Sequence, residues 1–144
     1  MNENGIYPVY GANGIISFID NYQIDSDSIL IIKDGAGVGK VQFGKGKFSV
    51  IGTLNYLIAK SGVNLKYIFY SLKFFNFEKY KVGSGIPHIY FKDYGESFIF
   101  CPSLDEQRNI EKLLSSIDEK IKIEKTLLQK YEMQKKHLLQ NLFI

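Results

Sequence analysis

The stretch CPSLDEQRNI, which runs from Cys101 to Ile110, separates two parts of the chain with different compositions. Nearly all the aromatic residues lie before it, and no glycine follows Gly95. Within the stretch, Ser103 and Glu106 have the spacing of a helix capping box, in which a serine side chain accepts a hydrogen bond from an early backbone N–H. The stretch therefore predicts that a helix starts directly after a body of a different structure.

Residues 103–144 are predicted to form one long helix, and residues 1–102 a separate domain. No proline or glycine interrupts the sequence after the capping box, and a helix from there to about Asn141 extends for about 55 Å. Its apolar residues recur with the 4-3 spacing of a coiled-coil seam, which Glu124 and Lys135 interrupt. The residues predicted to contact a partner helix are Ile110, Leu114, Ile117, Ile121, Leu128, Tyr131, Leu138 and Leu142.

This helix has two possible interpretations. An amphipathic helix can lie on its own domain, but a body of about a hundred residues has a radius of gyration near 13 Å, so a rod of this length overhangs it. The overhanging part would expose an apolar stripe to water and is therefore expected to need a partner helix. We favour the second interpretation, with a homodimer or a pair with a different chain as the two options.

The sequence before the junction contains short β-branched or aromatic runs separated by glycine, asparagine and aspartate turns. Asn64 is expected to cap a helix that ends near Phe74. The expected strands are YPVY (7–10), GIISFI (14–19), SILIIK (28–33), KVQF (40–43), KFSVI (47–51), LNYLIA (54–59), HIYF (88–91) and SFIFC (97–101). Together these elements predict an α+β fold, with a mainly antiparallel β-rich body followed by the long C-terminal helix.

The run KDGAGVGK, Lys33 to Lys40, looks like a phosphate-binding loop but fails both nucleotide-binding patterns. In the Walker A pattern, G-x-x-x-x-G-K-[ST], Asp34 would replace the first glycine and Val41 the hydroxyl residue that binds magnesium. In the dinucleotide pattern, Lys40 would replace the third glycine, and a strand-like sequence follows where a helix is needed. We therefore predict a strand–turn–strand without ATP binding, whose lysines either contact a nucleic-acid backbone or are plain surface.

The composition is that of a folded, soluble protein, with 45% hydrophobic and 23% charged residues and a formal net charge of +3. This charge permits nucleic-acid binding without requiring it. Cys101, His88 and His137 have no metal-binding or nucleophile–base spacing, so we expect no catalytic residue, no metal and no cofactor. Without a signal-like N-terminus or a run of about 18 apolar residues, we expect a cytoplasmic protein that does not contact a membrane.

The order of these motifs resembles one half of the specificity subunit of type I restriction–modification enzymes. The most specific element is P-[SP]-L-x-E-Q-x-x-I, here Pro102 to Ile110, together with the long helix that follows it. YGANGI near the N-terminus and GSGIP before the last expected strand add to the likeness. The resemblance covers nearly the whole chain. Full subunits carry two recognition domains and two helices, and their domain usually opens with a tryptophan-containing segment, so we expect a half subunit, a split gene product or a fragment.

The resemblance implies that residues 1–102 are a target recognition domain that reads one half of a bipartite DNA sequence. The long helix would be a spacer that packs antiparallel against a second long helix and docks methyltransferase subunits. Those subunits bind S-adenosylmethionine and carry the chemistry, so the chain itself would be a non-catalytic component. The alternative is a truncated interaction protein that binds a methyltransferase or another specificity chain without reading DNA.

If the resemblance holds, side chains in the glycine-flanked loops contact double-stranded DNA. Polar side chains are expected to reach base edges or sugars, and lysines to hold phosphates, although each position is also compatible with plain surface. The expected base or sugar contacts are Tyr10, Asn13, Asn55, Ser84 and His88. The expected phosphate contacts are Lys40, Lys45, Lys47 and Lys81.

Overall fold

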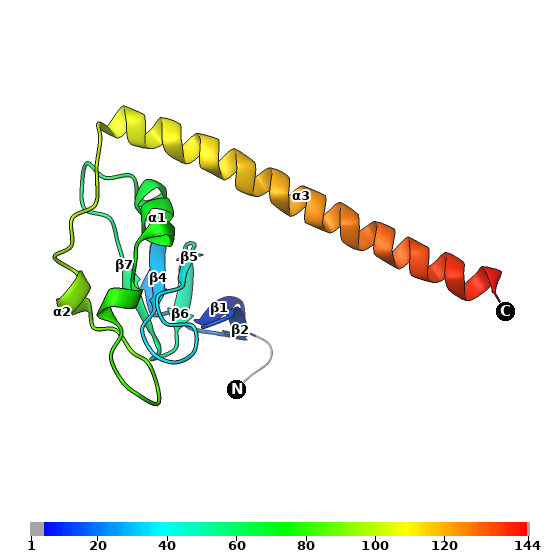
Figure 1. Ribbon diagram of the computed structural model, residues 1–144, viewed down its shortest axis with the longest axis horizontal. Helices are drawn as coiled ribbons and strands as arrows, with labels where there is room; N and C mark the ends of the chain where they lie inside the picture. Colours follow the sequence, from blue (N-terminus) through cyan, green and yellow to red (C-terminus); the bar gives the residue numbers. More distant parts are fainter. Residues whose placement is uncertain (1–4, 144) are drawn as a thin grey trace.

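The computed structural model describes residues 5–143, which form a β-rich body with one long helix projecting from it (Figure 1). The strands are β1 (Tyr7–Gly11), β2 (Gly14–Ile19), β3 (Ile24–Asp25), β4 (Ser28–Ile32), β5 (Val41–Gly44), β6 (Lys47–Val50) and β7 (Leu54–Leu57). The helices are α1 (Leu65–Phe74), the short 3-10 helix η1 (Glu78–Tyr80), α2 (Phe91–Tyr94) and α3 (Leu104–Leu142). The predicted α+β class with a long C-terminal helix is therefore confirmed.

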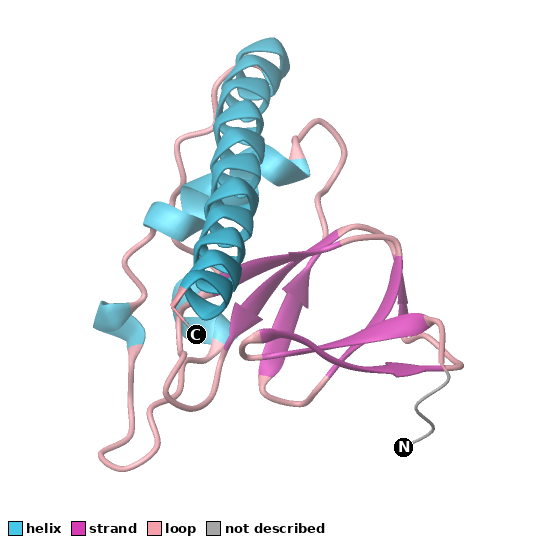
Figure 2. Cartoon of the chain, turned by 90° about the vertical axis from the view of Figure 1, so that its right-hand side faces the viewer, coloured by secondary structure: helices cyan, strands magenta, loops and turns pink. Residues whose placement is uncertain are grey.

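Two small sheets make up the body (Figure 2). One sheet has the strand order β2-β1-β6-β3, and the other has the order β5-β4-β7. Among the described residues, every strand pair is antiparallel except β1 with β6, which pair in parallel through Val9 with Ser49 and Tyr10 with Val50. The prediction of a mainly antiparallel body is confirmed, and this parallel pair is the exception.

Strand β4 is buried on both faces and lies at the centre of the core. Successive side chains of a strand point to opposite faces. Ile29 and Ile31 accordingly belong to a cluster on the side of α1, whereas Leu30 and Ile32 belong to a second cluster formed with β3, β6 and β7. The unbroken apolar run SILII is thus the sequence of a strand covered on both sides.

Helix α1 begins where the sequence predicts it. The side-chain oxygen of Asn64 accepts a hydrogen bond from the backbone N–H of Tyr67 at 2.8 Å, which satisfies one of the donors left unpaired at a helix start. The helix contacts β4 and β5, and Leu72 is buried against that sheet. This packing places the last turn of α1 at the edge of the body.

The predicted strands HIYF and SFIFC are wrong. His88 makes only isolated backbone bridges, with Asp34 and Val82, and the chain turns into α2 at Phe91. Residues 97–101 have no regular structure. The alternation that suggested strands arises because one residue in each segment, such as the buried Ile89, packs into the core while its neighbours face solvent. The two-residue strand β3 has no such pattern and was not expected.

Helix α3 is a single helix of 39 residues, about 58 Å long. Its start is capped as predicted, because the hydroxyl of Ser103 accepts a hydrogen bond from the backbone N–H of Glu106 at 3.4 Å. Only its first turns contact the body, and the rest projects away from it (Figure 1). No helix within residues 5–143 is both long enough and apolar enough to cross a membrane.

Candidate nucleic-acid interface

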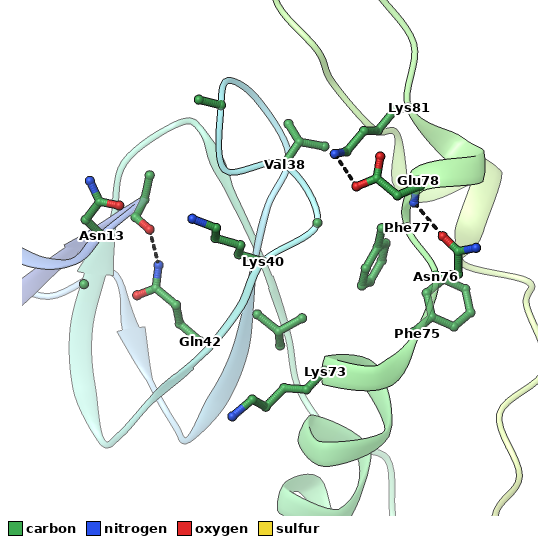
Figure 3. Close-up of a pocket in the computed structure, with 15 residues that line it drawn as sticks. Asn13, Val38, Lys40, Gln42, Lys73, Phe75, Asn76, Phe77, Glu78 and Lys81 are labelled. Carbon is green, nitrogen blue, oxygen red and sulfur yellow. Dashed lines mark hydrogen bonds and ion pairs between the residues drawn. The ribbon is translucent and has the colours of Figure 1, made fainter. Parts of the chain in front are cut away.

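A cleft of about 770 Å³ opens between the β-rich body and the C-terminal end of α1 (Figure 3). Its walls come from segments that are far apart in the sequence: the β1–β2 turn, the loop that leads into β5, the end of α1, and the segment around η1. The polar and charged residues that line the cleft are Asn13, Lys40, Gln42, Lys73, Asn76, Glu78 and Lys81. The fold thus gathers amide and ammonium groups, which are hydrogen-bond donors, in one place.

Gln42 holds one wall of the cleft in position. Its side-chain nitrogen donates to the backbone oxygens of Gly11 at 2.8 Å and Ala12 at 3.0 Å, so β5 is tied to the β1–β2 turn. Gly14 completes this turn with a φ of 101°, which a side chain would disfavour. Asn13 lies exposed at the tip of the turn (Figure 3). Gln42 is therefore a positioning residue, and Asn13 is available to a ligand.

The cleft carries uncompensated positive charge. Among residues 5–143, neither Lys40 nor Lys73 makes an ion pair, whereas Lys81 lies 2.6 Å from the carboxylate of Glu78. The ammonium of Lys73 lies 5.3 Å from the ring centroid of Phe69, so the aromatic face supports the lysine side chain. Two unpaired lysines on opposite walls can each hold an anionic group such as a phosphate.

The glycine loop forms part of this wall, but the backbone donors of Gly35, Val38, Gly39 and Lys40 are already occupied. The N–H of Gly35 donates to the oxygen of Pro87 at 2.9 Å, and the N–H of Gly39 donates to the oxygen of Ile32 at 2.9 Å. Val38 and Lys40 donate to carbonyls within the loop itself. Strand β5 follows, paired antiparallel with β4. The predicted strand–turn–strand is confirmed, and these four N–H groups are not free to hold the phosphates of a nucleotide.

Of the contact residues predicted from sequence, the cleft brings together Asn13, Lys40 and Lys81. Lys45 is exposed at the β5–β6 turn, outside the cleft. Lys47 is also outside, and its ammonium lies 3.7 Å from the carboxylate of Asp25 and 4.6 Å from the ring centroid of Tyr22. The Tyr22 hydroxyl and then the Asp25 charge raise the pKa of Lys47. Its charge is thus partly neutralised within the chain.

The remaining predicted residues are dispersed. The ring of Tyr10 packs edge-on against Phe48, 5.3 Å between centroids, at the border of the core. The amide nitrogen of Asn55 donates to the hydroxyl of Tyr94 at 3.2 Å, beside a separate hollow of about 420 Å³. Ser84 and His88 belong to the loop after η1, where Ser84 is exposed. Contact of any of these residues with DNA stays a prediction.

Sequence reasoning missed Gln42, Lys73 and Asn76. Lys73 stands in the last turn of a helix, and Gln42 stands within a strand, so neither has the glycine-flanked context that marked the other candidates. The position of Gln42 depends on hydrogen bonds to residues about thirty positions away. A polar residue inside an otherwise apolar strand is the only local signal that Gln42 offers.

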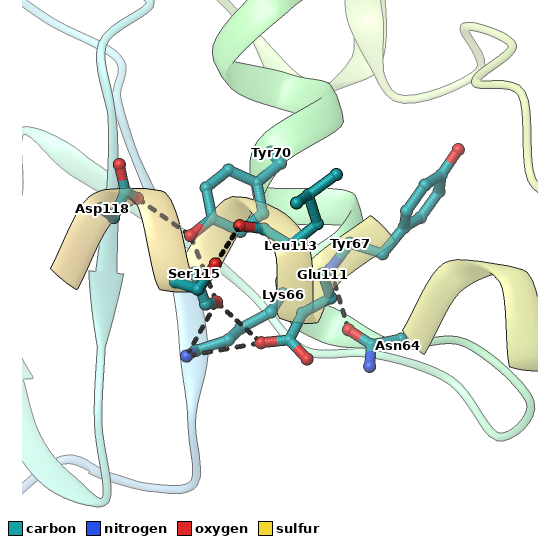
Figure 4. A network of polar contacts seen from close by, with 9 residues as sticks. Asn64, Lys66, Tyr67, Tyr70, Glu111, Leu113, Ser115 and Asp118 are labelled. Carbon is teal, nitrogen blue, oxygen red and sulfur yellow. Dashed lines mark hydrogen bonds and ion pairs between the residues drawn. The ribbon is translucent and has the colours of Figure 1, made fainter. Parts of the chain in front are cut away.

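A second feature is the polar network that fixes α3 to α1 (Figure 4). Gln107, which is only 2% exposed, accepts a hydrogen bond from the backbone N–H of Asn64 at 2.9 Å. One turn further along, the ammonium of Lys66 lies 3.6 Å from the carboxylate of Glu111. These contacts set the direction in which α3 leaves the body.

The network continues to the fourth turn of α3. The hydroxyl of Tyr70 donates to the carboxylate of Asp118 at 2.9 Å and lies 3.3 Å from the hydroxyl of Ser115 (Figure 4). Burial is the main cause that raises the pKa of Tyr70. The body therefore supports α3 as far as Asp118, after which every described residue of the helix is exposed.

The predicted seam residues divide between Leu114 and Ile117. Ile110 and Leu114 are half-buried beside the body. The others are exposed: Ile117, Ile121, Leu128, Tyr131, Leu138 and Leu142. An exposed apolar row of this length is unusual for an isolated chain.

A third feature is a group of exposed phenylalanines beside the root of α3. Phe74 at the end of α1 is 95% exposed, and Phe98 and Phe100 in the segment before α3 are 101% and 79% exposed. All three border a hollow of about 280 Å³. Clustered exposed aromatic side chains are typical of a surface that another protein covers.

These features define an α+β domain with a basic cleft and a projecting helix that bears an unpaired apolar row. The chain belongs to the family of type I restriction modification DNA specificity domains, whose family model matches residues 1–133. The resemblance seen in the sequence is therefore confirmed.

Curated relatives agree with this assignment. The chain is 30% identical over 116 residues to the specificity subunit of the type I restriction enzyme EcoprrI of Escherichia coli. This alignment covers 81% of this chain and 29% of that protein. It is 33% identical over an alignment of 151 residues to the MjaVIII specificity subunit of Methanocaldococcus jannaschii, with 96% and 35% covered. The chain thus spans about a third of the length of these relatives.

Solved structures share the fold. The S subunit of a type I restriction-modification system from M. genitalium aligns with a TM-score of 0.73 at 24% identity, covering 99% of this chain and 40% of that chain. A chain from a structure that describes complex assembly and conformational transition of the type I R-M system aligns with a TM-score of 0.69 at 21% identity, covering 94% and 37%. The similarity includes both the body and the long helix, since nearly the whole chain is aligned.

Proposed function

We propose that this chain is a DNA-recognition component of a type I restriction–modification system, in which the body reads one half of a bipartite target. The observation that carries the proposal is the cleft, where Lys40 and Lys73, which pair with no carboxylate of the described residues, flank the exposed Asn13. Family membership supports it, because the matching family is named for DNA specificity. The chain contributes recognition and assembly in this proposal, and a partner subunit contributes the catalysis.

In the proposed complex, the lysines position the body on the phosphate backbone, and amide side chains read base edges. An ammonium group holds a phosphate without regard to sequence, whereas the amide of asparagine can bond both N6 and N7 of adenine in the major groove. Asn13 is held at the cleft rim by the Gln42 clamp, and Asn76 lies on the facing wall. Asn13 is therefore proposed as the base-reading residue. The side-chain oxygen of Asn76 already accepts a hydrogen bond from the backbone N–H of Glu78 at 3.0 Å, so Asn76 is proposed to offer only its amide N–H groups to DNA.

The residues outside the cleft take a secondary place in this proposal. Lys45 and Ser84 are exposed on loops and are available to phosphates or sugars on either side of the half-site. Tyr10, Lys47, Asn55 and His88 each already contact groups of the chain itself. We expect smaller effects on DNA binding from these four than from the cleft residues.

Assembly is proposed to use α3 and the phenylalanine group. The exposed apolar row from Ile117 to Leu142 is proposed to pack against a second long helix, from another copy or from a different specificity chain. Methyltransferase subunits are proposed to dock on the remaining helix faces and on Phe74, Phe98 and Phe100, whose exposure supports a protein contact. The methyltransferase would bind S-adenosylmethionine and methylate adenine.

The test is selection of DNA by the purified complex of this chain with a methyltransferase subunit. A randomised duplex library should yield an enriched half-site with the complex and none with the methyltransferase alone. If the complex assembles but enriches no sequence, the chain is an interaction protein and the proposed reading of DNA is wrong. If no complex forms with any methyltransferase tested, the proposed docking is wrong.

A further inference from the structure

The exposed part of the apolar row on α3 contains two charges. From Ile117 to Leu142 the row extends about 38 Å along the helix, and its residues follow one another at spacings of four and three. Glu124 and Lys135 are the two charged members of the row. A charge at such a position is costly when a partner helix covers it, unless an opposite charge lies across the interface.

The spacing of this row reads the same from either end. Counted from Ile117 or from Leu142, the steps are four, three, four, three, four, three and four residues. When two identical helices pack antiparallel so that their rows from Ile117 to Leu142 overlap completely, Glu124 of each faces Lys135 of the other. In the same register Ile117 faces Leu142, Ile121 faces Leu138, and Leu128 faces Tyr131.

We propose that the occupant of this row is a second copy of the chain, antiparallel, in the register that pairs Glu124 with Lys135. A two-fold interface requires a self-complementary surface, in which residue i contacts j and j contacts i. The palindromic spacing and the opposite charges at symmetric positions meet this requirement. The inference rests on the proposed pairing of long helices and deepens it by naming the partner and the register.

Flanking charges support the same register. Lys125 and Glu132 each follow a seam residue directly, at the edge position of the heptad. Antiparallel helices bring such edge positions of the two chains opposite each other, so Lys125 of one copy meets Glu132 of the other. Four opposite-charge contacts therefore form by symmetry, two across the seam and two at its edges.

The proposed overlap of the two helices also begins where the body stops covering α3. Ile110 and Leu114 are half-buried by the chain's own body, whereas Ile117 is 47% exposed and Leu142 is 70% exposed. The proposed register covers the row from Ile117 to Leu142 and leaves the half-buried pair to the body. The second helix thus packs on the part of the row that the body leaves exposed.

The second helix can lie beside α3 without displacing the body. Gln107, Glu111 and Asp118 face α1, and residues on a helix are turned by about 100° from one to the next. Ile117 and Ile121 are thereby turned well away from the middle of the docking face, on its flank. The body and the second copy therefore occupy adjacent sides of the helix.

Other arrangements of two copies bring the charges into conflict. A parallel pair in register places Glu124 against Glu124 and Lys135 against Lys135, so like charges meet. An antiparallel pair shifted by one heptad leaves each of the two charges against an apolar side chain. The register with Glu124 facing Lys135 is the one that leaves neither charge unpaired.

Charge reversal in the full-length chain tests this inference. The variants are Glu124→Lys, Lys135→Glu and the double exchange, with Glu119→Lys and Lys130→Glu on another face of α3 as charge-matched controls. Sedimentation equilibrium measures the dimer dissociation constant, and circular dichroism verifies that the helix is intact. Each single reversal should weaken the dimer at least about tenfold, because it creates two like-charge contacts. The double exchange should restore the dimer to within about threefold, and the controls should change it less than that.

Rescue by the double exchange can occur only across the interface, since Glu124 and Lys135 lie three turns apart on one helix. In a parallel pair the double exchange would still set like charges against each other. A wild-type chain that is monomeric at micromolar concentration with its helix intact, or a double exchange as weak as the single reversals, would overturn the inference. Selection of a DNA half-site is measured separately, so such a result would leave the proposed function standing.

Discussion

The side chain of Gln107 accepts a hydrogen bond from the backbone N–H of Asn64 at 2.9 Å, and this contact joins the start of α3 to the cap of α1. The nitrogen of the same side chain donates to the backbone oxygen of Pro102 at 2.8 Å. Helix α1 also carries Lys73 at the edge of the cleft. Helix α1 therefore contributes both to the direction of the long helix α3 and to the shape of the cleft.

Replacement of Gln107 by leucine should destabilise the chain by about 1–3 kcal/mol, because the Asn64 N–H and the Pro102 carbonyl lose their partner in a buried place. Urea unfolding monitored by circular dichroism measures the change. Gln129→Leu, at an exposed position of the same helix, is the control and should be close to neutral. Equal stability of the Gln107 variant and the wild type would show that the bond does not hold the helix to the body.

Replacement of Lys40 and Lys73 by glutamine should weaken binding to all DNA sequences alike. Each lysine that neutralises a phosphate adds about one to the slope of log affinity against log salt, so the double variant should lose about two. Fluorescence anisotropy of the methyltransferase complex over a range of salt concentrations measures the slope. Lys60→Gln, outside the cleft, serves as the control.

Lys47→Gln gives a graded comparison in the same assay. Because Asp25 and Tyr22 already contact this lysine, its loss should change the salt slope less than the loss of Lys40 does. A larger effect from Lys47 than from Lys40 would place the phosphate contacts at the start of β6 instead of in the cleft.

Gly39→Ala should destabilise the body by about 1–3 kcal/mol. Gly39 has a φ of 86°, and a Cβ atom there would lie 2.7 Å from the Cβ of Phe77, across the cleft wall. Gly52→Ala is a matched control, since a Cβ at Gly52 meets nothing within 4 Å and its φ is not positive. The two variants are compared by urea unfolding. Similar stabilities would mean that the loop does not need this tight backbone.

Stability should fall at alkaline pH because of Tyr94. Burial is the main cause that raises the pKa of Tyr94 in the folded chain, whereas the unfolded residue has a pKa of about 10. The stabilising contribution of the neutral phenol is therefore complete below about pH 10 and is lost as the pH rises through the folded pKa.

Unfolding free energies measured at a series of alkaline pH values test this prediction. Tyr94→Phe should flatten the decline, at the cost of lower stability at neutral pH, because Asn55 loses the hydroxyl that accepts its hydrogen bond. A decline that is just as steep in the variant would assign the pH dependence to another group.

The elements that could be predicted from the sequence are those whose determinants are local. Ser103 and Asn64 cap their helices through bonds to residues three positions away, and both helices start where expected. Because no glycine or proline follows the capping box, the sequence predicts one uninterrupted helix, and α3 is such a helix as far as Leu142. Strand β4 could be recognised because a short apolar run with turn signals on both sides is sufficient evidence.

The features that could not be predicted depend on contacts between distant segments. Gln107 has the sequence context of a surface residue, and its burial follows only from the position of Asn64 in space. The clamp by Gln42 and the place of Lys73 in the cleft likewise require the tertiary fold. The strand predictions for HIYF and SFIFC were wrong for a related reason. An alternating pattern does not reveal whether a neighbouring strand is present to pair with the segment.

The most direct test of the proposed function is sequencing of methylated adenines in cells that carry this chain together with its methyltransferase subunit. The proposal predicts methylation at a bipartite sequence, palindromic when two copies of the chain pair, and a loss of that methylation with the Lys40 and Lys73 double variant. Identical methylation in cells with and without the chain would contradict the claim that the chain selects the DNA sequence.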